Sequence, residues 1–148
     1  MQRRSLVKIL LATPFVSSLF KSAAVFANWN IEAFTKTSEK EALESFFPDR
    51  EILESDAISI DVHDLIENGA VVPVKIKTEL NAVSGISLLV ERNPNPLIAH
   101  FDLSPECRPF VATRIKIGVP SDIIAVVESE GKLYSRRKFV EVVEGGCG

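Results

Sequence analysis

The sequence has few of the residues from which most catalytic and metal sites are built. Its 148 residues include only two cysteines and two histidines. The histidines, His63 and His100, stand alone in their segments, and a lone histidine is more often structural than a ligand. No Cys-x-x-Cys pair, phosphate-binding loop, His-rich cluster or Ser-His-Asp spacing is present. We therefore expect no catalytic residues of the chain's own, no bound metal and no cofactor.

An excess of positive charge is also missing. The chain has 17 basic and 20 acidic residues, for a net charge of −3. Such a protein is a poor candidate for binding nucleic acid or an anionic membrane surface, so neither is expected as a partner. A membrane-spanning helix needs about 20 apolar residues, and the longest apolar run, residues 9–20, is shorter and is interrupted by polar residues and a proline.

The N-terminus has the pattern of an export signal. A basic start is followed by the apolar run, and small residues then lead to a signal-peptidase site that ends at Ala27. The twin arginines Arg3 and Arg4, with the residues that follow them, resemble a twin-arginine (Tat) signal, which exports folded cargo. An ordinary Sec signal is the alternative. We predict a signal peptide over residues 1–27 and a periplasmic protein.

The predicted mature chain, residues 28–148, has the size of a single domain. The signal holds four of the 17 basic residues and none of the 20 acidic ones, so its removal leaves 13 against 20 and a net charge of −7. We expect one folded domain over residues 28–144, followed by a short C-terminal arm over residues 145–148.

A short helix is predicted near the start of this domain. Ser38 and Glu41 have the spacing of a capping box, and Pro48 ends the helix. Between them lies an apolar stripe formed by Ala42, Leu43, Phe46 and Phe47. Residues 28–37 have no such pattern and are predicted to be unstructured or lightly packed.

From residue 58 onward, the hydrophobic pattern takes the period of two that is typical of strands. We predict seven strands, over residues 58–62, 72–78, 86–92, 98–103, 111–119, 123–129 and 133–143. Turn signals, among them a turn at residues 67–69 and the Glu-Gly hairpin signal at residues 130–131, separate them at roughly the 8–12-residue spacing of sandwich folds. The predicted fold is therefore all-β: an immunoglobulin-like antiparallel β-sandwich of about seven strands with a short N-terminal helix.

Pro73 lies inside the second predicted strand. Proline cannot donate a ladder hydrogen bond, so this strand is predicted to be a sheet edge or to carry a bulge. An edge strand would offer unpaired backbone groups to a second β-protein.

The chain ends in Gly145-Gly146-Cys147-Gly148. Glycine lacks a Cβ, and a terminus without packing is usually mobile, so we expect a flexible arm with the thiol of Cys147 near its tip. Its four residues span at most about 13 Å, which suits entry into another protein's active site. Acidic groups and no basic residue adjoin Cys147 in the sequence, which disfavours the thiolate and argues for a passive carrier over a thiol enzyme.

Cys107 leaves a second interpretation open. Two cysteines in an exported protein suggest a Cys107–Cys147 disulfide by default, and the chain would then be a secreted structural or binding domain. Cys107 lies in the segment Ser104–Pro109 between predicted strands. A bridge from there to a penultimate residue preceded by two glycines would constrain little of the chain.

The tail and three internal segments together resemble the SoxY family, the sulfur-carrying subunits of the thiosulfate-oxidising Sox system. The internal segments are Glu-Asn-Gly-Ala-Val-Val-Pro-Val at 67–74, Asn-Pro-Asn-Pro at 93–96 and Thr-Arg-Ile-Lys at 113–116. The family tail is Gly-Gly-Cys-Gly-Gly, so this chain is one glycine shorter. The resemblance implies that Cys147 is the carrier cysteine, that Gly145, Gly146 and Gly148 form its arm, and that the fold is an immunoglobulin-like sandwich.

The resemblance also implies a set of partners. A c-type cytochrome complex would join thiosulfate oxidatively to the carrier sulfur, and a manganese-dependent thiohydrolase would release sulfate. In some systems a sulfane dehydrogenase oxidises the sulfur that is left. The carrier itself catalyses nothing. It would form a heterodimer with SoxZ, a small partner without a signal of its own that is exported with it.

Overall fold

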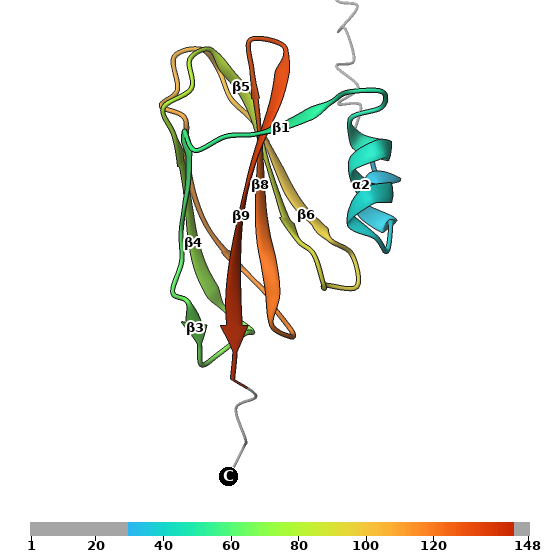
Figure 1. The fold of residues 1–148 in the computed structure, drawn as a ribbon, viewed down its shortest axis with the longest axis vertical. Helices are drawn as coiled ribbons and strands as arrows, with labels where there is room; N and C mark the ends of the chain where they lie inside the picture. Colours follow the sequence, from blue (N-terminus) through green and yellow to red (C-terminus); the bar gives the residue numbers. More distant parts are fainter. Residues whose placement is uncertain (1–29, 144–148) are drawn as a thin grey trace, which may run out of the picture.

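The computed structural model describes residues 30–143, which form two β-sheets packed face to face with a helix against the outer face of the larger sheet (Figure 1). The predicted β-sandwich with a short N-terminal helix is therefore confirmed. The elements in chain order are η2 (Ala33–Thr35), α2 (Glu39–Phe46), β1 (Ile52–Glu54), β2 (Ile58–Asp61), β3 (Leu65–Ile66), β4 (Val72–Thr78), β5 (Val83–Val90), β6 (Leu97–Asp102), β7 (Phe110–Ile115), β8 (Ser121–Ser129) and β9 (Lys132–Val142). None of the helices in this part of the chain is long and apolar enough to cross a membrane.

The larger sheet has the strand order β1-β9-β8-β5-β6, with β3 paired to the far end of β9, and the smaller sheet has the order β2-β4-β7. All seven predicted strands are present and pair antiparallel with one another. The strands β1 and β3 were not predicted, and both pair parallel to β9. They have three and two residues, too few to show a period of two.

The main core lies between the two sheets and contains the inward side chains of both. In β4, buried and exposed residues alternate, because only one face of the smaller sheet meets the core. In β8 the run from Ile123 to Val127 is buried without interruption. Its inner face meets the smaller sheet, while Ile124 and Val126 face a second cluster beneath α2. The helix therefore covers the apolar outer face of the larger sheet, which the smaller sheet does not reach.

The start of α2 agrees with the predicted cap, since the Ser38 hydroxyl accepts a hydrogen bond from the Glu41 backbone N–H at 3.2 Å. The prediction that the segment before the helix is unstructured or lightly packed is wrong at Ala33–Thr35, which form the 3-10 helix η2. Ala33, in η2, is fully buried in the cluster beneath α2, and the Asn30 side chain donates to the Ser45 carbonyl at 2.8 Å. A single helical turn is too short to show an amphipathic pattern in sequence.

The prediction that Pro73 marks an edge or bulged strand is also wrong, because β4 is the central strand of its sheet and has no register shift. The Thr78 N–H points toward β7, because it donates to the Pro109 carbonyl. Backbone nitrogens point alternately to the two sides along a strand, so the nitrogen of Pro73, five residues earlier, points toward β2. The ladder with β2 ends at the pair Asp61–Lys75. Proline is tolerated at this point because β2 no longer lies alongside.

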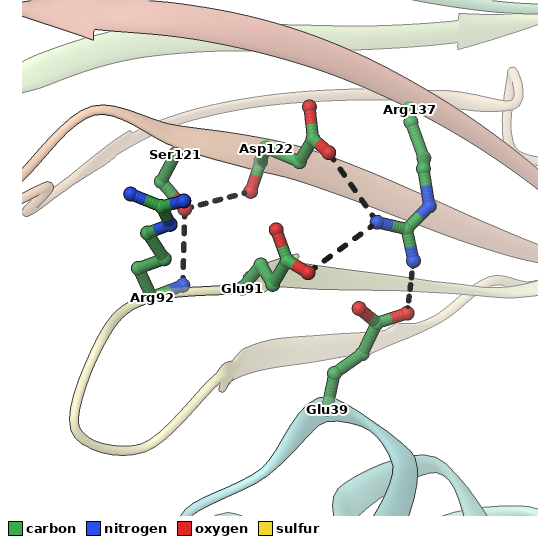
Figure 2. Close-up of polar contacts among 6 residues, drawn as sticks. All are labelled: Glu39, Glu91, Arg92, Ser121, Asp122 and Arg137. Atoms are coloured by element: carbon green, nitrogen blue, oxygen red, sulfur yellow. Dashed lines mark hydrogen bonds and ion pairs between the residues drawn. The ribbon is translucent and has the colours of Figure 1, made fainter.

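Arg137 on β9 joins α2 to the larger sheet, as Figure 2 shows. Its guanidinium pairs with Glu39 of α2, with Asp122 of β8 at 3.4 Å and with Glu91 at 3.9 Å. Partial burial acts to lower the pKa of Arg137, but the hydrogen bonds and charges of Glu39 and Asp122 outweigh it and raise this pKa above its usual value. One cation therefore offsets three carboxylates, which come from α2, β8 and the β5–β6 connection.

Replacing Arg137 with methionine is expected to lower the free energy of unfolding by about 1 kcal/mol, because three carboxylates lose their shared cation at a partly exposed site. Urea denaturation measures the change. The matched control is Arg136→Met, whose guanidinium pairs with the highly exposed Asp56. It should cost less than about 0.5 kcal/mol. Equal losses in the two variants would show that the Arg137 cluster does not fix α2.

Candidate functional site

The predicted site residues Cys147, Gly145, Gly146, Gly148, Arg3 and Arg4 all lie outside the described residues. The last described residue is Val143, which directly follows β9. The described part of the site is therefore the end of the sandwich at which β9 finishes, at the bottom of Figure 1. We call this end the base. It consists of the end of β9 and the three connections over residues 62–71, 91–96 and 116–120.

The base brings together the three internal segments that resemble the SoxY family. Because β9, β8 and β5 are successively antiparallel, the β5–β6 connection with residues 93–96 lies at the end where β9 finishes. The pair Val72–Ile115 places the start of β4 and the end of β7 at this end too. The Asn93 side chain donates to the Lys116 carbonyl at 2.7 Å, which ties two of the segments together.

Gly69 allows a close approach of backbone at the base. The Ile117 N–H donates to the Gly69 carbonyl at 2.8 Å. A Cβ built on Gly69 would lie 2.1 Å from the Ile117 carbonyl oxygen, a backbone atom with little freedom to move. Only glycine permits this approach of the segment before β4 to the connection after β7. The predicted turn at residues 67–69 is thus also a packing contact.

The end of β9 is held on its outer side by the chain around β3. The Glu141 N–H donates to the Asp64 carbonyl at 2.8 Å, and the Val143 N–H donates to the Ile66 carbonyl at 2.9 Å. Lys138 adds a hydrogen bond to the Val62 carbonyl at 2.8 Å. The backbone is therefore fixed as far as Val143, immediately before the segment that carries Cys147.

Several large apolar side chains are exposed around this end of β9. Leu65 on β3 is 54% exposed and Phe139 on β9 is 55% exposed. Leu65 pairs with Glu141, so its side chain shares the outer face of β9 with Phe139 and Val143. A shallow groove of about 340 Å³ lies beside them. It is lined by His63, Leu65, Ile66, Glu67, Asn68, Val71, Val72 and Pro73. Exposed apolar groups of this kind are typical of surfaces that contact other molecules.

Cys107 is exposed and lies at the opposite end of the sandwich. It lines a hollow with residues 78–83, and the Ala82 carbonyl accepts from the Glu130 N–H, beside the start of β9. The eleven residues of β9 separate this end from the base by roughly 33 Å. The four residues from Val143 to Cys147 extend at most about 14 Å. The chain is therefore too short for the Cys107–Cys147 disulfide of the alternative interpretation.

The structure brings together one trio that the sequence did not suggest. Ser87 and His100 are paired across β5 and β6, with 2.8 Å between the Ser87 hydroxyl and Nδ1, and His100 Nε2 lies 3.1 Å from Asp102. Ser87 is fully buried, and Phe46 of α2 packs against the imidazole, so no substrate can reach the hydroxyl. The trio is a structural contact beneath the helix. Within residues 30–143, no three His, Cys, Asp or Glu side chains form a group that could hold a metal ion.

Comparisons with known proteins agree with the resemblance of the tail and the internal segments to the SoxY family. The family model for SoxY, described as sulfur oxidation protein SoxY, matches residues 43–147. The solved structure of the sulfur carrier protein SoxY from Chlorobium limicola f thiosulfatophilum is 34% identical, with a TM-score of 0.65, and the match covers 70% of this chain and 94% of that one. A second solved structure, an engineered protein, has 9% identity and a TM-score of 0.43 over 58% of this chain and 20% of its own, too low to carry an argument. No curated protein matches.

Replacing Gly69 with alanine is expected to lower the free energy of unfolding by about 2 kcal/mol, because the new methyl group overlaps the Ile117 carbonyl. The matched control is Gly118→Ala in the adjoining connection, where a Cβ would meet no atom within 4 Å. That variant should be nearly neutral. Urea denaturation of both variants makes the comparison, and equal stability would show that the base does not require the close approach at Gly69.

Proposed function

The chain belongs to the SoxY family of sulfur oxidation proteins, and from this premise we propose that it carries sulfur-oxidation intermediates covalently on Cys147. The family match and the similarity to a sulfur carrier support a carrier role in sulfur oxidation. The attachment residue, the partners and the location are parts of the proposal. The observation that carries it is the extent of the family match, which continues through the tail to residue 147.

The base supports this proposal through its rigidity. Hydrogen bonds hold β9 to Val143, and Cys147 follows four residues later, so its thiol stays within about 14 Å of a fixed point. Glycine at 145, 146 and 148 leaves little side-chain bulk around the sulfur. The carrier would thus present its cargo at one defined end of the sandwich. The exposed apolar side chains at that end offer contact area to the enzymes that act on the cargo.

The proposed chemistry can be written for the Cys147 sulfur alone. The thiolate and thiosulfate form a sulfur–sulfur bond and give Cys–S–S–SO₃⁻, with two electrons passing to a c-type cytochrome complex. A manganese thiohydrolase then adds water across the bond to the sulfonate group, releasing sulfate and two protons and leaving Cys–S–S⁻. In some systems a sulfane dehydrogenase would oxidise this remaining sulfur. The partners supply the oxidant and the activating groups, and this chain holds the intermediate without catalysing a step.

The proposal includes a heterodimer and a route out of the cytoplasm. A SoxZ-like small β-protein would bind the folded carrier and be exported with it. The twin arginines of residues 1–27 give a reason for joint export, because a Tat signal moves folded cargo. The carrier would then work in the periplasm, where its thiol meets an oxidising environment.

Intact-mass measurement tests the carrier role. After incubation with its SoxZ-like partner, thiosulfate and the c-type cytochrome complex, the chain should gain the mass of one thiosulfate unit, which a reductant removes. Cys147→Ser should gain nothing, because the acceptor sulfur is absent. Cys107→Ser, the matched control, should be loaded as fully as the unaltered chain. An equal adduct on Cys147→Ser would overturn the proposal.

The export route has its own test. Replacing Arg3 and Arg4 together with lysine should retain the full-length precursor in the cytoplasm, because the Tat pathway depends on the arginine pair while a Sec signal tolerates lysine. Cell fractionation and immunoblotting measure the distribution. The SoxZ-like partner should be retained with it. Unchanged export of both chains would assign the signal to the Sec pathway instead.

A further inference from the structure

The two outer faces of the sandwich differ in what covers them. On the larger sheet, α2 and η2 pack over outward side chains of β5, β6, β8 and the start of β9, which are buried: Leu89, Leu97, Ile124, Val126 and Leu133. On the smaller sheet, no element of residues 30–143 lies over the outward side chains of β2, β4 and β7, at the left of Figure 1. We call this surface the open face. Its outward residues are all exposed: Ser59, Asp61, Pro73, Lys75, Lys77, Phe110, Ala112 and Arg114.

The strand register arranges these side chains in rows. Lys77 lies between Ser59 and Phe110, and Lys75 lies between Asp61 and Ala112. In the last row Pro73 is opposite Arg114. Phe110, a large apolar residue at the β7 edge, is 44% exposed. The open face thus combines exposed apolar surface with three cations.

The charge of the open face is opposite to that of the chain. Three cations and one carboxylate occupy it, whereas the whole chain has a net charge of −3. Asp61 lies 3.8 Å from Lys75 and so offsets only that cation. Lys77 and Arg114 form no ion pair with any carboxylate of the described residues. Two positive charges therefore remain available to a molecule that covers this face.

A molecule that covers the open face must be acidic where it touches Lys77 and Arg114. Cations that lose their hydration at an interface need opposite charges there. A second copy of this chain packed open face to open face would set cations against cations, because a two-fold interface repeats the same patch on both sides. The exposed apolar groups of Pro73, Phe110 and Ala112 favour a folded protein, which can bury them, over a small anion. We propose that the open face docks a separate folded protein with an acidic contact surface.

The inference rests on the proposed function in one respect, because the probe that tests it is the purified SoxZ-like subunit. Calorimetric titration compares the unaltered chain with the double variant Lys77→Glu and Arg114→Glu. The variant should bind roughly 10- to 100-fold more weakly, since it places like charges across the interface. The matched control, Lys40→Glu with Lys132→Glu, makes the same change of charge at exposed positions away from both the open face and the base, and it should bind normally.

Hydrogen exchange provides a second readout that does not depend on a substitution. Binding of the SoxZ-like subunit should slow hydrogen exchange in peptides from β4 and β7, and the affinity should fall as the salt concentration is raised.

The open face is overturned as the docking surface if the two double variants bind the subunit equally well and exchange in β4 and β7 is not slowed. That result would leave the proposed attachment of sulfur to Cys147 unaffected. Failure of the unaltered chain to bind the subunit would overturn the heterodimer as well. Vesicles of phosphatidylglycerol test a membrane as the alternative. If the unaltered chain and the control variant bind them and the variant Lys77→Glu with Arg114→Glu does not, the open face is a membrane-binding surface and the inference is overturned.

Discussion

The register of β9 against β8 is the constraint on which the rest of the structure depends. The ladder runs from Ser121–Val140 to Ser129–Lys132, and Glu130 and Gly131 form its turn with φ values of 51° and 75°. Left-handed conformations at both positions are those of the two-residue turn that matches strand twist. A slip of one residue would turn Val140 out of the core and Arg137 away from α2. The same strand also pairs with β1 and β3, so its position fixes both the helix-covered face and the base.

The long strand β9 lies between the end of the sandwich that holds Cys107 and the base, after which the segment with Cys147 follows in the sequence. Cys107 is held at the turn end of the hairpin, while β9 carries the chain to the base before Cys147 is reached. An exposed thiol roughly 33 Å away cannot close on the tail of the same molecule. The carrier function proposed for Cys147 therefore does not compete with the intrachain disulfide of the alternative interpretation.

The sequence was sufficient where structure follows from local pattern. The period of two located the seven main strands, the Ser38 cap located α2, and the Glu-Gly pair located the last turn. It was insufficient where position depends on distant partners. The strands β1 and β3 form only because β9 offers them an edge, and Pro73 is tolerated in a central strand only because β2 ends early. Likewise, the segments 67–74, 93–96 and 113–116 are separate in the sequence, and only the topology shows that they meet at the base.

The central claim is that one thiol of this chain carries sulfur during thiosulfate oxidation. Peptide mass mapping of the chain, isolated without reductant from cells that are oxidising thiosulfate, tests it most directly. The account predicts that the C-terminal peptide with Cys147 carries sulfane or thiosulfonate adducts that disappear when thiosulfate is withdrawn, while the peptide with Cys107 stays unmodified. A C-terminal peptide that remains unmodified throughout, or adducts that form equally on both cysteines, would contradict it.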